Sequence, residues 1–504
     1  MMTARELDAL TSWNADWTGV RVLVLGLGVT GFSVADTLAE LGCTVLVAAS
    51  SADEPTAEIL DVIGVELVVG PLEHGVPDRV ARFEPDIVIV SPGFPPTHPA
   101  VVWAGQDGRA VWGDIELAWR LRDKVGPPAE WIVVTGTNGK TTTVQLTAAM
   151  LVAAGVRAAP CGNVGVPVLD AIRDPGGFDV LVVELSSFQL HYLGELSPWA
   201  SACLNIADDH LDWHGSREAY EAAKGKVYWG TRTACVFNQD DPVTRRLVEA
   251  AEVVDGCRAI GFGLGIPGPS DFGIVDGILC DRAFLDDRRN TALEIATVPE
   301  LTEVGLGGAH MLANALAASA LARSYGVPID AVRQTLLAFR PDHHRTELVA
   351  LERGIRWIDD SKATNAHAAQ ASLTSFDSVV WMVGGLLKGA SLDELIARAV
   401  PRLKAAIIIG TDRADVAASF ARHAPQLPVF EVDTTDTNEV MPTAVRLASE
   451  LAGDGDVVLL APAAASMDQF RDYADRGSRF ADAVRELLGG GPDDDKPSAT
   501  PKVP

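Results

Sequence analysis

The sequence predicts an α/β protein of three domains, in which mostly parallel sheets alternate with helices. Three observations lead to this prediction. Short apolar runs recur along the chain and end in glycine or polar residues, as buried parallel strands do. One of these runs, at 131–134, leads directly into a glycine-rich phosphate-binding loop. Finally, 504 residues exceed one hydrophobic core, and about 150 residues per domain suggests three domains.

The domain boundaries are expected where the pattern of strands and helices restarts. We place a Rossmann-like domain at 1–113, a P-loop ATPase-like domain at 114–340 and a second Rossmann-like domain at 341–488. The remaining segment, 489–504, has the sequence GGGPDDDKPSATPKVP and has no apolar face. Such a segment cannot bury enough surface to fold, so we expect a disordered tail.

Composition excludes several classes of partner. Lysine and arginine total 41 against 68 acidic residues, a net charge of −27, and no basic run occurs. This argues against nucleic acid or an anionic membrane as the main partner. The six cysteines form no CxxC pair, which favours reduced thiols over zinc or disulfides. The amino terminus lacks the pattern of a signal peptide, and no apolar stretch approaches about 18 residues. We therefore expect a soluble, cytoplasmic protein without membrane insertion.

The first domain begins with a β-rich run at 20–25, followed by GLGVTG at 26–31 and an apolar helix to about Leu41. The spacing GxGxxG is typical of dinucleotide folds, but alone it is a weak signal. An NAD site favours an acid after the second strand, whereas the strand at 45–47 runs into Ala-Ala-Ser at 48–50. We expect a site for a nucleotide or its diphosphate; the alternative is that the glycines serve only close packing. Further strands are expected at 66–69 and 87–90.

The central sequence WIVVTGTNGKTTT places a strand, a glycine loop and a helix in the order of a phosphate-binding loop. Backbone N–H groups at the start of the helix would face an anion. Lys140 would reach the outer phosphates and the Thr141 hydroxyl would bind Mg²⁺. The longer form GxxxxGK(S/T) has glycine where this chain has Val134, so the loop is the shorter TGTNGKT form. The alternative is a glycine turn followed by a solvated lysine.

Polar residues follow two further expected strands of the central domain. One apolar run ends in Glu184, and the strand expected at 202–206 leads to Asp209 and His210. Ligands collect beyond the carboxyl ends of parallel strands, so these side chains should converge with the phosphate loop. Oxygen ligands at such an edge suit Mg²⁺ and a triphosphate. Taken alone, His210 would be read as an ordinary capping or surface histidine; its position in this strand-end group makes a metal role an equal alternative.

The rest of the chain continues the alternation. A glycine turn opens a small-residue helix at 305–322, on which Asn314 follows His310 by one turn. Residues 261–300 show weak alternation and many turns, so we expect an irregular β excursion without assigned chemistry. Strands of the third domain are expected at 356–358, 379–383, 405–409 and 457–460.

These motifs together resemble the Mur ligases. The resemblance covers about 20–485, and two segments, DDSKATN at 359–365 and SMDQF at 466–470, are similar to the members that add D-glutamate. It implies three domains, for a UDP-sugar, for ATP and for the incoming amino acid. It also implies an ATP-dependent acid–amino-acid ligase: ATP phosphorylates the carboxylate of UDP-N-acetylmuramoyl-L-alanine, and the amine of D-glutamate attacks the acyl phosphate. This is a step of peptidoglycan precursor synthesis, and we expect a monomer.

The resemblance also implies roles for individual residues. Catalytic roles fall to Lys140, Glu184, His210, Lys224 and Arg345. ATP contacts fall to Gly136, Thr137, Asn138, Gly139, Lys140, Thr141, Thr142, Asn314, Arg345, Asp360 and Lys362. Two Mg²⁺ ions are implied, with ligands from Thr141, Glu184, His210 and a CO₂-derived carbamate on Lys224. Substrate contacts fall to Val29, Thr30, Ser91, Asn163, His210, Thr364, Lys388, Ser466, Met467 and Tyr473.

Several alternatives stay open at the level of sequence. Uracil recognition in the family uses an acid after the second strand, where this chain has Ala49 or Ser50. Tyr473 stands where an aromatic residue without a hydroxyl also occurs, so a packing role is an alternative. Lys226 is the rival to Lys224 for the carbamate. Rival functions are a nucleotide-dependent oxidoreductase, a P-loop protein that binds ATP without using it, and another ATP-dependent amide ligase such as a folylpolyglutamate synthase.

Overall fold

The computed structural model describes residues 2–340, 342–387, 389–434 and 436–489. It confirms the predicted α/β fold class, because the described residues form three sheets with mostly parallel strands. The chain divides into two compact units, one up to Phe339 and one from Arg340 on, and each is described by itself. The expected division of the first unit at 113/114 stays a prediction. The expected tail lies outside the described residues, apart from Gly489.

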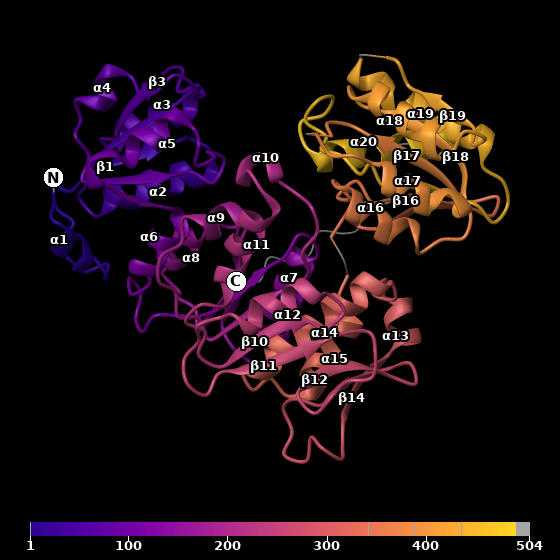
Figure 1. Cartoon of the computed structure of the whole chain (residues 1–504), viewed down its shortest axis with the longest axis horizontal. Helices are drawn as coiled ribbons and strands as arrows, with labels where there is room; N and C mark the ends of the chain where they lie inside the picture. Colours follow the sequence, from indigo (N-terminus) through magenta and orange to yellow (C-terminus); the bar gives the residue numbers. More distant parts are fainter. Residues whose placement is uncertain (1, 341, 388, 435, 490–504) are drawn as a thin grey trace. The chain divides into compact units, whose positions relative to one another are not determined.

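The first sheet has the order β3-β2-β1-β4-β5 and is parallel throughout. Its strands are β1 (Arg21–Leu25), β2 (Thr44–Ala49), β3 (Glu66–Val69), β4 (Ile87–Val90) and β5 (Ala110–Trp112). The accompanying helices are α1 (Ala4–Asp8), α2 (Val29–Glu40), α3 (Glu54–Val62), α4 (Asp78–Ala81) and α5 (Pro99–Ala104). Both faces of β1 are buried, which explains its continuous apolar run. This sheet is drawn in indigo in Figure 1.

The central sheet has the order β14-β13-β12-β11-β10-β9-β6-β8-β7. Its strands are β6 (Glu130–Thr135), β7 (Ala158–Gly162), β8 (Val180–Glu184), β9 (Ala200–Cys203), β10 (Ala234–Asn238), β11 (Arg258–Phe262), β12 (Asp271–Val275), β13 (Ile278–Asp281) and β14 (Leu293–Thr297). The helices are α6 (Asp114–Arg120), α7 (Lys140–Ala153), α8 (Val168–Arg173), α9 (Ser187–His191), α10 (Leu211–His214), α11 (Arg217–Gly225), α12 (Pro242–Glu249), α13 (Val298–Glu303), α14 (Ala309–Ser324) and α15 (Ile329–Ala338). Buried alanines on α14 allow it to pack closely on the same core as β6 and α7.

Two expectations for this sheet are corrected. The strand expected at 202–206 ends at Cys203, because the Asn205 side chain and the Ile206 N–H bond to other segments. The excursion expected at 261–300 is part of the main sheet: β11 pairs in parallel with β10, and β12 to β14 extend the sheet as antiparallel hairpins. Short strands separated by frequent turns weaken the alternation that a sequence pattern would show.

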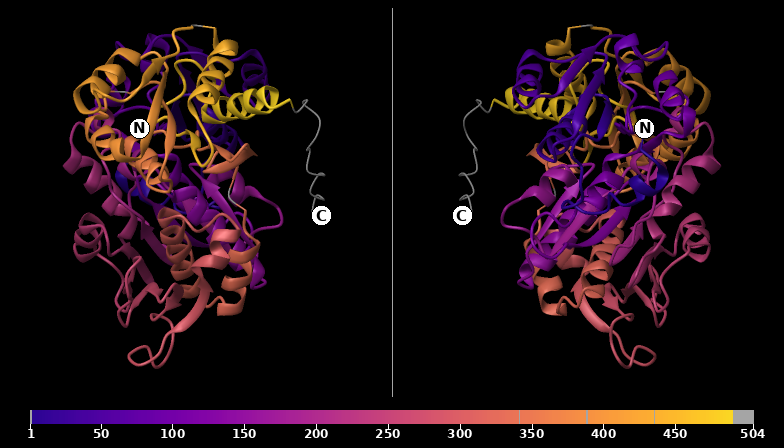
Figure 2. Two further views of the ribbon diagram at one scale, coloured as in Figure 1. Left: turned by 90° about the vertical axis from the view of Figure 1, so that its right-hand side faces the viewer. Right: turned by 90° about the vertical axis from the view of Figure 1, so that its left-hand side faces the viewer.

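The second unit contains a sheet of order β15-β16-β20-β17-β18-β19, in which only the β15–β16 pair is antiparallel. Its strands are β15 (Glu347–Glu352), β16 (Ile355–Asp359), β17 (Val379–Gly384), β18 (Leu403–Ile409), β19 (Val429–Glu431) and β20 (Val457–Leu460). Its helices are α16 (Ala366–Leu373), α17 (Asp393–Ala399), α18 (Arg413–His423), α19 (Thr437–Leu451) and α20 (Tyr473–Leu487), the last drawn as the yellow helix in Figure 2.

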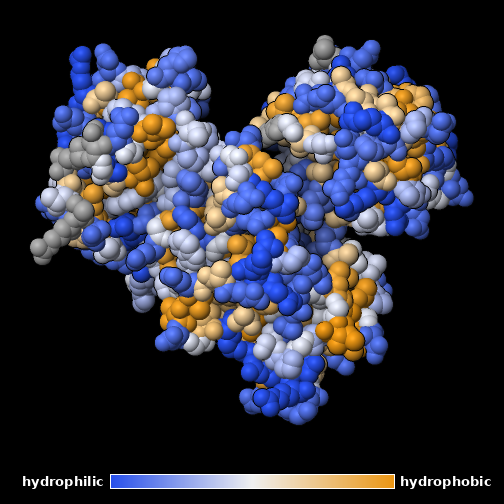
Figure 3. Space-filling view, in the orientation of Figure 1, coloured by the Kyte–Doolittle hydropathy of each residue, from blue (hydrophilic) through white to orange (hydrophobic). Residues whose placement is uncertain are grey.

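The surface shows the mixture of residue types that is usual on folded domains. Figure 3 shows hydrophilic residues over most of the displayed face, with apolar residues in small patches between them. Within the described ranges, none of the helices combines the length and apolar character needed to cross a bilayer.

Candidate functional site

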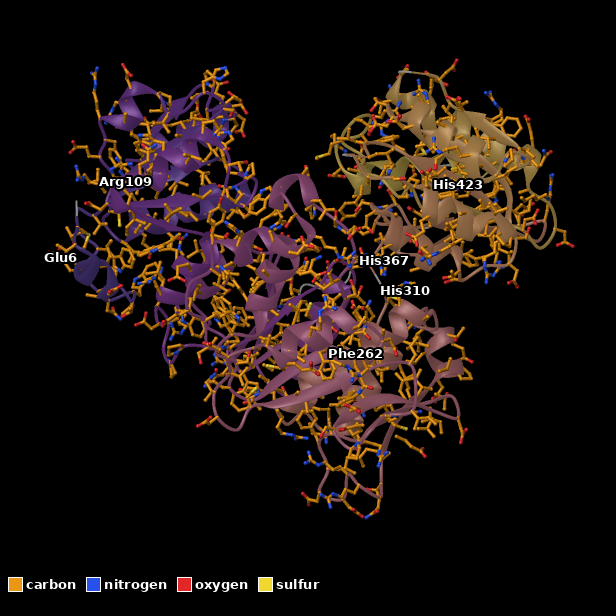
Figure 4. All side chains as sticks on the ribbon, viewed as in Figure 1. Glu6, Arg109, Phe262, His310, His367 and His423 are labelled. Atoms are coloured by element: carbon orange, nitrogen blue, oxygen red, sulfur yellow. The ribbon has the colours of Figure 1, made fainter. Side chains whose placement is uncertain are left out.

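The phosphate-binding loop lies between β6 and α7. Gly136 and Gly139 both adopt positive φ angles, 154° and 84°, which only glycine accepts readily. A Cβ at Gly139 would lie 2.3 Å from the Asn314 side-chain oxygen, so α14 packs directly against the loop. Figure 4 labels His310 in the first turn of α14, one turn before Asn314. The structure therefore brings Asn314 to the loop, as its predicted role requires.

A second segment holds this loop from the side of β9. The Asn138 N–H donates to Asn205 Oδ1 at 2.9 Å, and Asn205 Nδ2 donates to the Asn138 carbonyl at 3.1 Å. The Ala207 N–H donates to Thr137 Oγ1 at 2.9 Å. Sequence reasoning missed Asn205, although a polar residue just beyond the strand next to the P-loop strand was a usable signal. These bonds fix the loop backbone.

Two lysines meet under the loop. Lys140 Nζ donates to the carbonyls of Gly136 and Thr137, each at 2.9 Å. Lys224 Nζ donates to the same Gly136 carbonyl at 2.8 Å and to Thr135 Oγ1 at 3.3 Å. Lys224 is 2% exposed, and burial, followed by the charge of Lys140, lowers its pKa to about 7. A large fraction of the Lys224 amine is therefore neutral near pH 7.

The rival lysine lies in a different environment. Lys226 Nζ donates to the carbonyls of His191 and Leu193, at 2.8 and 3.3 Å. Burial also lowers its pKa. The bonds that the structure records for Lys226 thus lead to the end of α9 and the residues after it, whereas those of Lys224 lead to the P-loop.

Glu184 ends β8 directly beside the P-loop strand, where it pairs with Val134. Its Oε1 accepts a bond from Asn163 Nδ2 at 3.0 Å, while Oε2 is buried and has no hydrogen-bond partner among the residues that the structure describes. A buried carboxylate oxygen without a partner is costly unless a cation or a donor joins it. This oxygen and the buried Thr141 at the start of α7 fit the oxygen-donor set that Mg²⁺ prefers.

His210 precedes α10 and has a left-handed backbone, with φ 53°. Its Nε2 lies 3.5 Å from Asp209 Oδ2. Its ring makes an edge-to-face contact with the Phe188 ring, with the ring centroids 4.7 Å apart. The segment that carries it leaves β9, which is the neighbour of β6 in the sheet. The structure thus places His210 on a loop that follows a strand next to the P-loop strand, and its metal role stays a prediction.

The glycine segment of the first sheet is built for close packing. A Cβ at Gly31 would lie 2.1 Å from the Gly26 carbonyl oxygen, which supports the packing role considered above. Ser91 Oγ donates to the same carbonyl at 3.4 Å, because β4 pairs with β1. Val29 and Thr30 form the first turn of α2, and Val29 is exposed. Three of the predicted substrate residues, Val29, Thr30 and Ser91, therefore gather at one sheet edge.

In the second unit, hydrogen bonds join the segment HRTE at 344–347 to the end of β16 and the loop that follows it. His344 Nδ1 lies 2.6 Å from Asp359 Oδ2, and this contact raises the pKa of His344. The Thr346 N–H donates to Asp360 Oδ1 at 3.2 Å, and the Lys362 N–H donates to the His344 carbonyl at 3.1 Å. Arg345 is thereby held on the same short stretch of backbone as these contacts. The His344–Asp359 pair was not predicted from the sequence.

The residues of this unit that are predicted to bind D-glutamate include one group after β16 and another after β20. Lys362 Nζ lies 3.6 Å from the centre of the Tyr473 ring, a cation–π distance. Ser466 is buried, whereas Met467 is exposed, and Thr364 is half-buried. Lys388 lies outside the described residues. The Tyr473 ring thus has a structural role toward Lys362, in addition to the packing role considered from the sequence.

A large cavity lies elsewhere in the first unit. It has a volume of about 1120 Å³ and is lined by residues of α1, α5, β5, α6 and the segment after α9, among them Trp112, Trp119 and Arg122. It contains none of the predicted site residues. Size alone therefore does not mark the functional site in this fold.

Three family models match consecutive parts of the chain. They are the Mur ligase MurD-like N-terminal domain at 20–113, the Mur ligase middle domain at 134–322 and the Mur ligase glutamate ligase domain at 344–464. The predicted boundaries are not tested by these ranges.

Curated relatives match over nearly the whole chain. A UDP-N-acetylmuramoylalanine–D-glutamate ligase of Leifsonia xyli is 64% identical and covers 99% of both chains. The enzyme of that name from Streptomyces avermitilis is 51% identical over 94% of this chain and 99% of its own.

Solved structures of low identity share the fold. A pseudomurein peptide ligase type C from Methanothermus fervidus has a TM-score of 0.56 at 16% identity, covering 93% of this chain and all of the other. The UDP-N-acetylmuramate–alanine ligase of Thermotoga maritima has a TM-score of 0.54 at 19% identity, covering 93% and 99%. Given the family models and the near-complete match to curated relatives, the chain belongs to the Mur ligase family.

Proposed function

We propose that the protein is an ATP-dependent ligase that joins D-glutamate to UDP-N-acetylmuramoyl-L-alanine in peptidoglycan precursor synthesis. The observation that carries this proposal is the 64% identity, over 99% of both chains, to a ligase of that name. The folded TGTNGKT loop, with its lysines and the neighbouring Glu184, supports it independently, because it is built for a nucleotide phosphate.

The chemistry requires an activated carboxylate. A carboxylate oxygen of the acceptor attacks the γ-phosphorus of ATP, ADP leaves, and the resulting acyl phosphate is attacked by the D-glutamate amine with loss of phosphate. The protein's task is positioning and charge neutralisation rather than nucleophilic attack by a side chain. In our proposal the first sheet binds the UDP-sugar through Val29, Thr30 and Ser91. Asn163 contacts its muramoyl-alanine part.

We assign the nucleotide phosphates to the P-loop. Residues 136–142 would bind them through backbone N–H groups, and Lys140 would neutralise charge on the outer phosphates. When bound, Mg²⁺ would neutralise the phosphates further. Thr141, Glu184 and His210 would hold two such ions together with a modified Lys224. The partnerless Oε2 of Glu184 supports a cation at this position.

The surroundings of Lys224 support its proposed modification. Two ammonium groups that share the Gly136 carbonyl repel each other, and burial lowers the pKa of Lys224 to about 7. The neutral amine can attack CO₂, giving a carbamate and releasing one proton. The product is an oxygen ligand of the kind that Mg²⁺ prefers, in place of a cation that would repel it. Lys226, tied to His191 and Leu193, has no comparable path to the loop in the recorded bonds.

In the second unit we assign Arg345, Asp360 and Lys362 to the nucleotide. Arg345 would reach the transferring phosphate. D-glutamate would be held by Thr364, Lys388, Ser466, Met467 and Tyr473. A dicarboxylate needs fixed cations, and the net charge of −27 offers no general attraction for it.

We further propose a monomer that works in the cytoplasm, the compartment that supplies ATP.

A comparison of acceptors tests the function. ADP release is measured with UDP-N-acetylmuramoyl-L-alanine, with longer UDP-linked peptides and with a folate acceptor, each combined with D- or L-glutamate. We expect turnover only with the L-alanyl acceptor and D-glutamate. Turnover with a folate acceptor would favour a folylpolyglutamate synthase, and ATP binding without ADP release in any combination would favour a non-enzymatic P-loop protein.

A further inference from the structure

One arginine in the second unit is completely buried. Arg476 lies in the first turns of α20 and is 0% exposed. Its Nε donates to Ser361 Oγ at 2.9 Å, its Nη2 to the Ser361 carbonyl at 2.8 Å and its Nη1 to the Ala464 carbonyl at 3.1 Å. The Ser361 hydroxyl in turn donates to the Tyr473 carbonyl at 2.7 Å. One guanidinium therefore binds two separate loops and, through Ser361, the start of its own helix.

The two loops are those to which we assign the amino acid. Ser361 follows β16 and precedes Thr364, while Ala464 follows β20 and precedes Ser466. The two strands are parallel neighbours, with Asp359 opposite Leu460, so both loops leave the sheet at its carboxyl edge. Arg476 bridges the two loops, beside a backbone bond from the Ala463 N–H to the Ala363 carbonyl at 2.9 Å.

The desolvation cost of burying the Arg476 charge indicates that its hydrogen bonds have a specific role. Burial lowers the pKa of Arg476 to about 10, so the side chain still carries its charge near neutral pH. The three oxygens that it binds are uncharged, and an apolar side chain of similar volume would fill the same space at a lower desolvation cost. A planar fork of donors, however, fixes its acceptors in one geometry, which neither methionine nor lysine can do.

We propose that Arg476 is a positioning residue for D-glutamate, which it does not touch: it holds the 361–364 loop and the 464–467 loop at the spacing that the amino acid requires. This inference rests on the proposed function.

The nucleotide contacts depend less on Arg476, because they have supports of their own. The Asp360 N–H donates to the Leu460 carbonyl at 2.8 Å, and the Lys362 N–H donates to the His344 carbonyl at 3.1 Å. Three of the residues assigned to D-glutamate, in contrast, are divided between the two loops: Thr364 lies in one, and Ser466 and Met467 lie in the other. Loss of Arg476 should therefore weaken D-glutamate binding much more than ATP binding.

The test compares Arg476→Met and Arg476→Lys with Arg479→Met in the full-length enzyme. Arg479 lies one turn further along α20 and bonds to Asp475 and Asn438, away from both loops. We expect Arg476→Met to raise the KM for D-glutamate about tenfold or more, the loss that one or two charged hydrogen bonds produce. The KM values for ATP and for the UDP-linked acceptor should change by less than about twofold. Arg479→Met should resemble the wild type.

Chemical rescue adds a readout that a general packing defect would not move. In Arg476→Ala, millimolar guanidinium chloride should lower the KM for D-glutamate, whereas sodium chloride at the same concentration should not. Arg476→Lys keeps the charge but loses the fork, so its KM should lie between those of the wild type and Arg476→Met. If Arg476→Met does not fold, the folded Arg476→Lys and the rescue experiment decide the question. Equal rises in all three KM values, or an unchanged KM for D-glutamate, overturn the proposal.

Hydrogen exchange separates this inference from the proposed function. Arg476→Met should increase amide exchange at 361–364 and 464–467 but not at 413–423, whatever the reaction is. Unchanged exchange in both loops overturns the positioning role. Wild-type protein that releases no ADP with D-glutamate overturns the function while leaving the exchange result intact.

Discussion

Lys224 in the first unit and Arg476 in the second are buried cations that donate to main-chain carbonyls near the carboxyl edge of a parallel sheet. Both lie almost completely out of contact with solvent. Burial is the main cause of a lowered pKa in each, yet the pKa of Lys224 falls to about 7 and that of Arg476 only to about 10. A second cation, Lys140, adds to the effect at Lys224.

The difference shows that burial changes the charge state of the lysine but not that of the arginine. An ammonium group that starts near 10.5 becomes partly neutral when it is buried beside another cation, and a neutral amine is a nucleophile. A guanidinium starts from a higher pKa than an ammonium group and keeps its charge when it is buried. Lys224 is therefore available for chemistry, whereas Arg476 remains a rigid set of donors.

The largest expected effect is that of Lys140→Ala, which removes the neighbour that distinguishes the Lys224 site. Loss of a charge aimed at the phosphates should lower kcat by about 100- to 1000-fold. It should also raise the pKa of Lys224, because one cause of its shift is gone. Activity is measured by ADP release, and folding is checked by circular dichroism. A correctly folded variant with unchanged kcat would remove the P-loop assignment.

Lys224→Ala tests whether the partly neutral lysine serves as a modified ligand. We expect the variant to lose most of its activity and to recover part of it with formate or acetate, which can occupy the vacated ligand position. Lys226→Ala is the matched control. It should keep its activity, and added formate or acetate should not change that activity. Full activity of Lys224→Ala in bicarbonate-depleted buffer, without additive, would show that this lysine does not belong to the metal site.

Lys224→Met tests the same comparison through stability. The pKa is about 7 in the folded protein and near 10.5 in the unfolded chain, so between these values the unfolded chain binds one more proton. The free energy of unfolding of the wild type should then rise as the pH rises from 7 to 10, and the penalty should be complete below pH 7. Without CO₂, Lys224→Met should be more stable at pH 7 by up to about 4 kcal/mol, less the contribution of the hydrogen bonds that the Lys224 amine makes.

Urea unfolding at several pH values measures this difference. The advantage of Lys224→Met should shrink toward pH 10, and bicarbonate should stabilise only the wild type. A pH-independent difference between the two proteins would contradict the lowered pKa.

The smallest expected effect concerns an anion that is buried away from the site. Burial raises the pKa of Asp114 to about 6, although Gln189 donates to its Oδ2 at 2.9 Å. Because the folded state holds the proton more tightly, the free energy of unfolding falls as the pH rises from 4 to 6 and stays lower above. Asp114→Asn should therefore stabilise the protein at pH 8 by up to about 3 kcal/mol and give no gain below pH 4. The exposed Asp61→Asn is the control; equal effects of both would contradict burial as the cause.

The sequence alone determined the features that depend on neighbouring residues. Alternation of apolar runs with glycine and polar loop residues predicted the α/β class and eleven of the twenty strands in the described residues, because the pattern is local. Gly136, Gly139 and Lys140 marked the P-loop for the same reason. The prediction was wrong where a local pattern misleads: β9 ends at Cys203, although apolar Leu204 and Ile206 follow it.

Tertiary structure alone decided which chemically similar residues become special. Lys224 and Lys226 lie two positions apart, yet only Lys224 Nζ bonds to Thr135, 89 residues away, while Lys226 bonds back to His191. In the same way, Arg476 reaches Ser361 across 115 residues. Burial, pKa and bonding partner depend on the order of strands in the sheet and on which helix covers them. Those contacts join distant segments, so no local pattern of residues encodes them.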